Sequence, residues 1–258
     1  MTSVRDRPAP QPAPERLSPS GRPRLPSPDM VGSVKGGDAS LETMDPQNAP
    51  NLPTSRVAIV DYGMGNLHSV KRKLDRIGVH AQLTSEPSDV LRADKLLLPG
   101  VGHFGKAMEH LARLSLVPAL HEAVMVKKTP ILGICLGMQL FARRSEEGGA
   151  EGLGWIDADV RRFRIDDTLR FKVPHMGWNG VRLARSSPLL EGVTEQTEFY
   201  FVHAYHMVCR DSGDVLCDTD YGYPFTSVVR RENLYGVQFH PEKSHDAGEA
   251  LLRNFLSL

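Results

Sequence analysis

The alternation of short apolar runs with helical stretches from Arg56 onward is the feature that most restricts the fold of this chain. Val57 to Val60, Lys95 to Leu98 and Thr129 to Ile134 have the length and side chains of strands. Apolar runs of this kind are typical of parallel strands that are covered on both faces. Parallel strands need crossover connections, and the helical stretches between the runs can supply them. We therefore expect an α/β fold with its active site outside the carboxyl ends of the strands.

The stretches between the apolar runs carry helical spacing. Leu67, Val70, Leu74 and Ile77 recur at positions that share one helix face, which predicts a helix over about residues 67–77. From Val160 onward the chain is richer in strands and turns, which indicates a mixed, mostly parallel sheet with antiparallel additions and helices on both faces. Further helical material is expected in 105–128, 136–141 and 246–256.

The first 54 residues differ in composition from the rest. They hold 11 of the 19 prolines and few large apolar residues, so we expect a disordered proline-rich extension over 1–54 and one domain over 55–258. Basic and acidic residues number 31 each, which gives no charge argument for a nucleic-acid partner. The sequence has no apolar run long enough for a membrane span, no secretory signal and only three scattered cysteines. A cytoplasmic protein without membrane contact is expected.

A glycine-flanked cysteine is the candidate nucleophile. The segment Gly133-Ile134-Cys135-Leu136-Gly137 has the form G-x-C-x-G where a buried strand is expected to turn into a helix. This is the layout of a nucleophile elbow with cysteine in place of serine. Glycines are expected on both sides because side chains there would clash in so tight a turn. A helix N-terminus also favours the thiolate. Cys209 and Cys217 lack such flanks and are expected to be ordinary buried side chains.

The candidate base lies near the C-terminus. Gly236 to Glu242 begins as an alternating strand and ends in His240-Pro241-Glu242. Proline keeps the residue before it extended, so the side chains of His240 and Glu242 are expected on the same side. The carboxylate can then hold the imidazole in one tautomer and stabilise its charged form. The sequence alone does not show that His240 reaches Cys135. No histidine pair has convincing metal-ligand spacing, so neither a metal nor a cofactor is expected.

With these motifs in place, the chain from about residue 56 to its C-terminus resembles the class I glutamine amidotransferases. More narrowly, it resembles the glutaminase subunits of imidazole glycerol phosphate synthase, the HisH family of histidine biosynthesis. The segments that carry the resemblance are Gly133 to Gln139, Phe239 to Ser244, Asp61 to Asn66, Pro99 to Phe104, Ser145 to Gly148, Pro174 to Asn179 and Tyr200 to His203.

The resemblance implies a flavodoxin-like amidotransferase fold and the hydrolysis of glutamine to glutamate and ammonia. It implies that Cys135 attacks the side-chain amide, that His240 carries the proton to the leaving ammonia, and that Glu242 orients His240. Water then hydrolyses the glutamyl thioester.

The resemblance also suggests which groups bind the substrate. Charge that develops on the amide oxygen needs donors, and the backbone N–H groups of Val101, Gly102 and Leu136 are the candidates for an oxyanion hole. By similarity, Gln139 and Glu147 contact the glutamine, and the charge of Glu147 suits the α-ammonium group. Gly102 is expected beside the substrate as well.

Such glutaminases dock on the synthase that uses the ammonia, because ammonia released into water is largely protonated and lost as a nucleophile. The resemblance implies a separate partner, the cyclase subunit, which is a (β/α)₈ barrel. That subunit forms a heterodimer with the glutaminase and makes imidazole glycerol phosphate and an aminoimidazole carboxamide ribotide (AICAR). Positions that match the family's interface are Asn66, His175, Trp178, Tyr200 and Lys243. Core packing is the alternative for Trp178 and Tyr200.

Three other functions stay open at this point: the glutaminase of another synthase such as anthranilate synthase, a stand-alone γ-glutamyl hydrolase or cysteine peptidase, and a catalytically dead regulatory module. The Asp61 to Asn66 and Pro174 to Asn179 segments argue against the first. A complete Cys-His-Glu set argues against the third. Ala204 departs from the serine or threonine that relatives often have, which would weaken glutamine binding only if the hydroxyl contacts the substrate.

Overall fold

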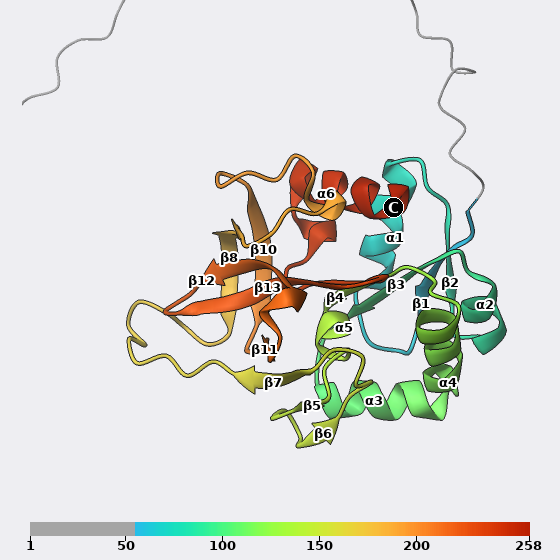
Figure 1. The fold of residues 1–258 in the computed structure, drawn as a ribbon, viewed down its shortest axis with the longest axis horizontal. Coiled ribbons are helices and arrows are strands. Elements are labelled where there is room, and N and C mark those ends of the chain that lie inside the picture. Colours follow the sequence, from blue (N-terminus) through green and yellow to red (C-terminus); the bar gives the residue numbers. More distant parts are fainter. Residues whose placement is uncertain (1–54) are drawn as a thin grey trace, which may run out of the picture. The chain divides into compact units, whose positions relative to one another are not determined.

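The computed structural model describes residues 55–258, in which strands and helices alternate first and strands dominate later (Figure 1). The predicted disorder of residues 1–54 falls outside the described residues. The helices are α1 (Leu67–Arg76), α2 (Pro87–Arg92), α3 (Phe104–Arg113), α4 (Leu116–His121), which continues into a π-helical turn (Glu122–Val126), α5 (Leu136–Gln139) and α6 (His245–Ser257). The strands are β1 (Val57–Val60), β2 (Ala81–Thr84), β3 (Lys95–Gly100), β4 (Ile131–Cys135), β5 (Arg144–Ser145), β6 (Ala150–Glu151), β7 (Ala158–Arg162), β8 (His175–Gly180), β9 (Arg182–Leu183), β10 (Glu198–His203), β11 (Tyr205–Cys209), β12 (Val215–Asp220), β13 (Pro224–Arg231) and β14 (Leu234–Val237).

The parallel part of the sheet positions the candidate site. Its strands lie in the order β2, β1, β3, β4, β14, and each neighbouring pair is parallel. Gly100 pairs with Cys135, and Val237 pairs with Ile134. Because the strands are parallel, their carboxyl ends meet at one edge, where the nucleophile and the segment after β14 come together. The predicted parallel sheet is confirmed, and β1, β3 and β4 coincide closely with the expected runs.

Antiparallel strands extend the sheet beyond β14, as predicted for the second half of the chain. β14 pairs with β13, β13 with β11, and β11 with β7, all antiparallel. β12 also pairs with β13, and β9 pairs with β12. β8 and β10 form a separate two-stranded antiparallel sheet in which His175 faces His203 and Trp178 faces Tyr200. The fold is therefore a mixed α/β sheet.

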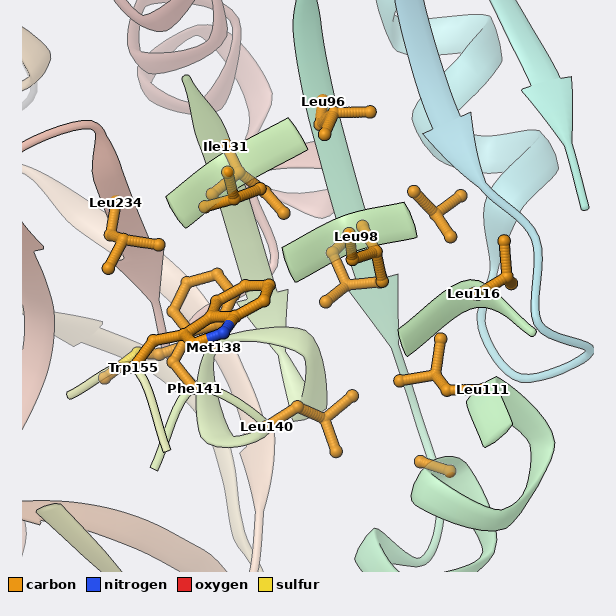
Figure 2. Packing of buried hydrophobic residues seen from close by; sticks show 14 of the residues in the cluster. Leu96, Leu98, Leu111, Leu116, Ile131, Met138, Leu140, Phe141, Trp155 and Leu234 are labelled. Carbon is orange, nitrogen blue, oxygen red and sulfur yellow. The ribbon is translucent and has the colours of Figure 1, made fainter. Parts of the chain in front are cut away.

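Alternating side chains of the central strands bury two separate cores, because successive residues of a strand point to opposite faces. One core faces α3 and α4 and includes Val60, Leu96, Leu98, Ile131, Leu111 and Leu116. The other faces α1 and α6 and includes Ile59, Leu97, Leu132, Leu74 and Leu252. Figure 2 shows the first core, where Met138, Phe141 and Trp155 cluster near Ile131 of β4 and Leu234 of β14. Helices thus cover both faces, as expected.

Some elements differ from the expectation. β2 and α2 carry no strong apolar period: β2 alternates buried and exposed positions at the edge of the sheet, and α2 begins at a proline. α5 ends at Gln139 rather than at Phe141, so it is a single turn. The expected helical material of 105–128 is divided into α3, α4 and the π-helical turn. Within residues 55–258, no helix has the length and apolar character needed to cross a membrane.

Replacing Gly137 tests how tightly α5 packs on β3. A Cβ at Gly137 would overlap the backbone carbonyl oxygen of Leu98, whereas a Cβ at Gly180 would meet only ordinary contacts at 3.8 Å or more. We expect Gly137→Ala to lower the free energy of unfolding by about 1–3 kcal/mol, the range for overpacking. Gly180→Ala is the matched control and should stay within about 0.5 kcal/mol of the wild type. Urea unfolding measures both, and equal stability of the two variants would contradict the close approach.

Candidate active site

Cys135 occupies the sharp turn between β4 and α5. Its backbone has φ 54° and ψ −110°, which is an unfavourable conformation for a residue with a side chain. Such strain is a feature of nucleophile elbows, where the turn lifts the nucleophile out of the sheet. The residue is 5% exposed. The predicted elbow is therefore present, with a helix shorter than expected.

The glycines on both sides allow this turn, for the reason given by the sequence pattern. A Cβ at Gly133 would lie 2.7 Å from the backbone nitrogen of Met138 and 2.7 Å from the ring of Phe141. A Cβ at Gly137 would collide with the carbonyl oxygen of Leu98. Both contacts are closer than real Cβ atoms tolerate, so the two positions require glycine.

His240 and Glu242 form a hydrogen-bonded pair beyond the end of β14. The backbone of His240 is extended, with φ −104° and ψ 93°, as expected before proline. Nδ1 of His240 lies 2.7 Å from Oε1 of Glu242, and both side chains are 2% exposed. The backbone N–H of His240 donates to the carbonyl of Tyr200 at 2.8 Å, and the hydroxyl of Ser244 donates to the carbonyl of His240 at 2.7 Å. These bonds hold the pair in place.

The electrostatics of His240 link it to Cys135. Burial lowers the pKa of His240, but the negative charge of Cys135 and the bond to Glu242 raise it more, to about 10. Nε2 of His240 is buried and has no hydrogen-bond partner among the described residues, so it remains for the thiol or a substrate. The arrangement favours the imidazolium form of His240 beside the sulfur of Cys135.

The two other cysteines lie in different surroundings. Burial raises the pKa of Cys209 to about 12 and that of Cys217 to about 12, with nearby aspartates adding to the effect. Both therefore stay protonated thiols near neutral pH. The prediction of an ordinary buried side chain fits Cys217, whereas Cys209 is half-buried.

The predicted oxyanion donors lie near Cys135 in the chain or across the sheet. Val101 and Gly102 come after Gly100, which pairs with Cys135 across β3 and β4. Gly102 has φ +110°, and a Cβ there would lie 2.8 Å from the terminal methyl of Met64. Val101 is 38% exposed at this edge. The N–H of Leu136 belongs to the residue immediately after the nucleophile. All three groups thus gather at the carboxyl edge beside the thiol.

The predicted substrate-binding side chains are tied to the protein. Gln139 is 4% exposed, and its Nε2 donates at 2.9 Å to the carbonyl of Tyr205 and at 2.9 Å to Oε1 of Gln238. A direct contact from Gln139 to a substrate would therefore use its carbonyl oxygen. Oε2 of Glu147 accepts from the backbone N–H of Phe104 at 2.8 Å, at the start of α3. Glu147 is half-buried, and its carboxylate lies close to the oxyanion segment.

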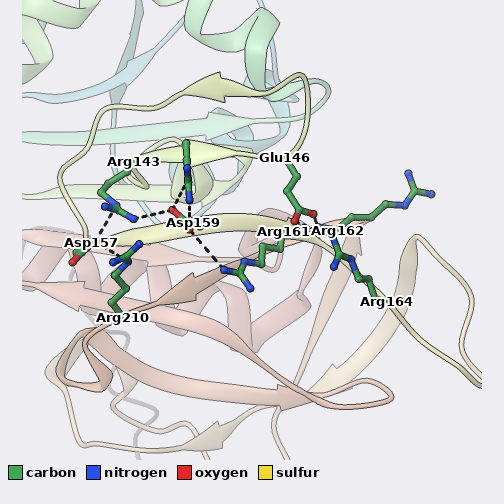
Figure 3. A network of polar contacts seen from close by, with 9 residues as sticks. Arg143, Glu146, Asp157, Asp159, Arg161, Arg162, Arg164 and Arg210 are labelled. Carbon is green, nitrogen blue, oxygen red and sulfur yellow. Dashed lines mark hydrogen bonds and ion pairs between the residues drawn. The ribbon is translucent and has the colours of Figure 1, made fainter.

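A polar network anchors the segment that carries Glu147 (Figure 3). Asp159 on β7 accepts from Arg143 at 3.1 Å and from Arg144 at 3.2 Å, and Arg161 lies 3.8 Å away. The hydrogen bond from Arg144 is the main reason that the pKa of Asp159 is lowered. The network holds β5 against β7 just before Glu147.

The predicted interface residues divide into exposed and buried ones. Trp178 is 44% exposed, stacks on the ring of His245 at 4.9 Å and meets Tyr200 edge-on at 5.9 Å. The ammonium group of Lys243 lies 5.5 Å from the Tyr200 ring centre. These residues form one surface of β8, β10 and the segment after His240. The core-packing alternative for Trp178 therefore does not fit its exposure.

Asn66 and His175 occupy other environments. Asn66 is exposed at the start of α1, and its side chain makes no capping hydrogen bond. His175 is 2% exposed and stacks on Phe201 at 4.8 Å and on Tyr221 at 3.9 Å. It therefore lies beneath the surface of β8 and would influence a partner only through its neighbours.

Two residues of the site were missed by sequence reasoning. Nε2 of Gln238 donates to the sulfur of Cys135 at 3.6 Å, and Gln238 is fully buried. Its place directly after a buried strand and before His240 was a usable signal, because a buried polar side chain usually has a specific partner. Tyr62 is also fully buried, and its hydroxyl has no hydrogen-bond partner among the described residues. It lies close to Gly100 and within the electrostatic reach of Cys135.

The pKa of His240 tests whether the charge of Cys135 acts on it. Because the folded-state pKa of His240 is raised from about 6.5 to about 10, the groups that hold its proton contribute stability that is fully present below about pH 6.5 and is lost as pH rises through 10. In Cys135→Ala, burial is opposed by Glu242 alone, so we expect the pKa of His240 to fall. Imidazole NMR titration measures it. Cys217→Ala removes a buried neutral thiol and should leave the pKa of His240 unchanged; the same result for Cys135→Ala would contradict the effect of Cys135 on His240.

Comparisons with known proteins give a family and several relatives for this chain. The family described as Glutamine amidotransferase class-I matches residues 58–258. The chain is 49% identical over 203 residues to "Imidazole glycerol phosphate synthase subunit HisH 2" of Pseudomonas aeruginosa, covering 78% of this chain and 99% of that protein. It is 46% identical over 200 residues to a protein of the same description from Methanococcus maripaludis, covering 78% and 98%.

Solved structures show the same fold at low identity. PurLQS from Thermotoga maritima aligns with a TM-score of 0.61 at 17% identity, over 79% of this chain and 98% of that one. A glutamine amidotransferase from Thermotoga maritima aligns with a TM-score of 0.56 at 16% identity, over 79% and 97%. At this level of identity the likeness concerns the fold alone.

Proposed function

The chain belongs to the class-I glutamine amidotransferase family, and from this premise we propose that it is the glutaminase subunit of imidazole glycerol phosphate synthase. In this role it hydrolyses glutamine to glutamate and ammonia and passes the ammonia to a cyclase subunit for histidine biosynthesis. The observation that carries the proposal is the meeting of a strained, glycine-flanked Cys135 with the buried His240–Glu242 pair at one sheet edge. The descriptions of relatives at 41–49% identity support the choice of synthase.

The proposed reaction starts from the thiolate of Cys135, which attacks the side-chain amide carbon of glutamine. The imidazolium of His240 gives its Nε2 proton to the departing nitrogen, so ammonia leaves and a glutamyl thioester remains. Neutral His240 then takes a proton from water, whose oxygen attacks the thioester carbon. Glutamate leaves, and the thiolate and imidazolium are restored. Glu242 stabilises the charged ring in both steps through the bond to Nδ1.

Backbone groups and two side chains are proposed to bind the substrate. The N–H groups of Val101, Gly102 and Leu136 surround the position where the amide oxygen gains negative charge. The free carboxylate oxygen of Glu147 is placed to meet the α-ammonium group, since its other oxygen is held by Phe104. The carbonyl oxygen of Gln139 is the remaining candidate contact.

A separate partner is part of the proposal. The partner is the cyclase, which folds as a (β/α)₈ barrel, and the two chains form a heterodimer. The surface formed by Trp178, Tyr200 and Lys243 supplies contacts, and Asn66, exposed at the start of α1, adds to them. Tryptophan and tyrosine are enriched in the cores of protein interfaces, whereas a lysine such as Lys243 suits the polar rim. A cytoplasmic location, where free thiols stay reduced, belongs to the same proposal.

Glutamate release tests the function and its dependence on a partner. The purified chain is assayed alone and with the cyclase plus its phosphorylated ribulosyl substrate. We expect hydrolysis mainly with the partner present. We expect Cys135→Ala to reduce kcat by about 10⁴-fold or more, because the nucleophile is lost. Glu242→Gln should reduce kcat by about 10²-fold or more, because His240 loses its carboxylate partner.

The outcomes separate the rival functions. Equal activity without any partner would favour a stand-alone γ-glutamyl hydrolase. Activation by the glutamine-dependent partner of another synthase, but not by the cyclase, would favour that synthase. Glutamate release that persists in Cys135→Ala would contradict the catalytic assignment.

Trp178 offers a test of the docking surface. Trp178→Ala removes a half-exposed aromatic side chain at the centre of the proposed surface, and we expect the Kd for the cyclase to rise about tenfold or more. Val126→Ala is the matched control, because Val126 is 60% exposed but precedes β4, at the opposite edge of the sheet from Cys135. Calorimetry measures both Kd values. If both variants weaken cyclase binding equally, or if neither weakens it, the docking surface lies elsewhere.

A further inference from the structure

A chain of hydrogen bonds reaches the nucleophile from the side of β11. Gln238 is fully buried, and its Nε2 lies 3.6 Å from the sulfur of Cys135. Its Oε1 accepts from Nε2 of Gln139 at 2.9 Å. The second N–H of Gln139 donates to the backbone carbonyl of Tyr205 at 2.9 Å. The amide that contacts the sulfur is therefore held at its other end by a second buried amide.

A pair of histidines bonds to the same carbonyl. Nδ1 of His203 lies 2.8 Å from the carbonyl oxygen of Tyr205, and Nε2 of His203 lies 3.1 Å from Nδ1 of His175. Nε2 of His175 lies 3.4 Å from the side-chain nitrogen of Asn179. The chain of bonds thus extends from Cys135 to β8, beneath the surface that carries Trp178.

The direction of each bond in this histidine pair follows from charge. Burial lowers the pKa of His175 to about 4 and holds the pKa of His203 well below its usual value, so both rings are neutral. A carbonyl only accepts, so Nδ1 of His203 carries the proton and Nε2 accepts from Nδ1 of His175. Nε2 of His175 then accepts from Asn179. Each ring is thereby restricted to one tautomer.

The same reasoning fixes the amide of Gln238. Gln139 uses its nitrogen for the Tyr205 carbonyl, so it presents an N–H to Gln238. Gln238 must therefore accept this bond with its side-chain oxygen, so its own N–H groups face the sulfur of Cys135. A rotated Gln238 would set two N–H groups against each other and two oxygen lone pairs against a thiolate. The network therefore requires a donor at the nucleophile.

We propose that Gln238 is a positioning residue that donates a hydrogen bond to the thiolate of Cys135 and is held in the donating orientation by Gln139 and the Tyr205 carbonyl. The inference rests on the nucleophilic role of Cys135 given under the proposed function. The donor stabilises the thiolate of Cys135 before it attacks the substrate. The histidine pair fixes the carbonyl to which Gln139 is bound.

The rate of alkylation of the full-length protein by iodoacetamide, measured against pH, tests the inference. Cys209 and Cys217 remain protonated below about pH 12, so the profile at lower pH reports Cys135. Gln238→Met keeps the length of the side chain and removes the donor. We expect the midpoint of the profile to move up by about one pH unit, so the rate below the midpoint falls about tenfold. The kcat for glutamine should fall while KM changes little.

Ser227→Ala is the matched control. Ser227 is fully buried on β13, its hydroxyl has no hydrogen-bond partner among the described residues, and its carbonyl still accepts from the backbone N–H of Gln238 in the variant. We expect its alkylation profile to match that of the wild type. A midpoint in folded Gln238→Met that matches Ser227→Ala would overturn the positioning role.

A second variant keeps the inference testable if Gln238→Met does not fold. Gln139→Met leaves Gln238 in place but removes the bond that sets its orientation, and we expect a midpoint shift in the same direction. An unchanged midpoint there would also count against the inference. Failure of the proposed function would give a different result. Cys135→Ala would then still release glutamate, or would be alkylated with the same pH profile as the wild type.

Discussion

The contact between the backbone of Gly137 and the carbonyl oxygen of Leu98 is the constraint on which the site depends. It brings α5 so close to β3 that the chain must turn within a single residue, Cys135, which takes up a positive φ. The turn points the thiol over the carboxyl edge of the sheet. β14 pairs in parallel with β4, so the chain that leaves β14 delivers His240 to the same edge. The distance of about 100 residues between the two in sequence is bridged by one strand pairing.

Burial has opposite effects on the histidines of this region, and their neighbours decide the outcome. His240 lies between Glu242 and Cys135, and two negative groups overcome the loss of solvation, so the charged ring is favoured. His175 and His203 lie against each other and among aromatic rings, and the neutral form is favoured. An isolated charge in such a low-dielectric interior would be costly. This buried region therefore holds one charged histidine, His240, and two neutral, hydrogen-bonded ones, His175 and His203.

Sequence patterns were sufficient where structure is set locally. The runs that became β1, β3 and β4, the G-x-C-x-G turn and the His240-Pro241-Glu242 pair depend on neighbours a few residues away. Long-range pairing decided the rest. The burial of His175 follows from its position opposite His203 in the β8–β10 sheet, and the contact of Gln238 with Cys135 follows from the pairing of β14 with β4. β2 went unpredicted because an edge strand needs only part of its side chains to be apolar.

The two tryptophans of the chain lie in contrasting surroundings, which makes the protein its own optical reporter. Trp155 is 4% exposed and packs on Phe141 at 5.4 Å, deep in the core beneath β4. Trp178 is half-exposed and stacked on His245. Covering β8 by another molecule removes water from one indole and leaves the other unchanged. A change in tryptophan fluorescence therefore reports the covering of β8 through Trp178, while Trp155 gives a constant signal and no attached dye is needed.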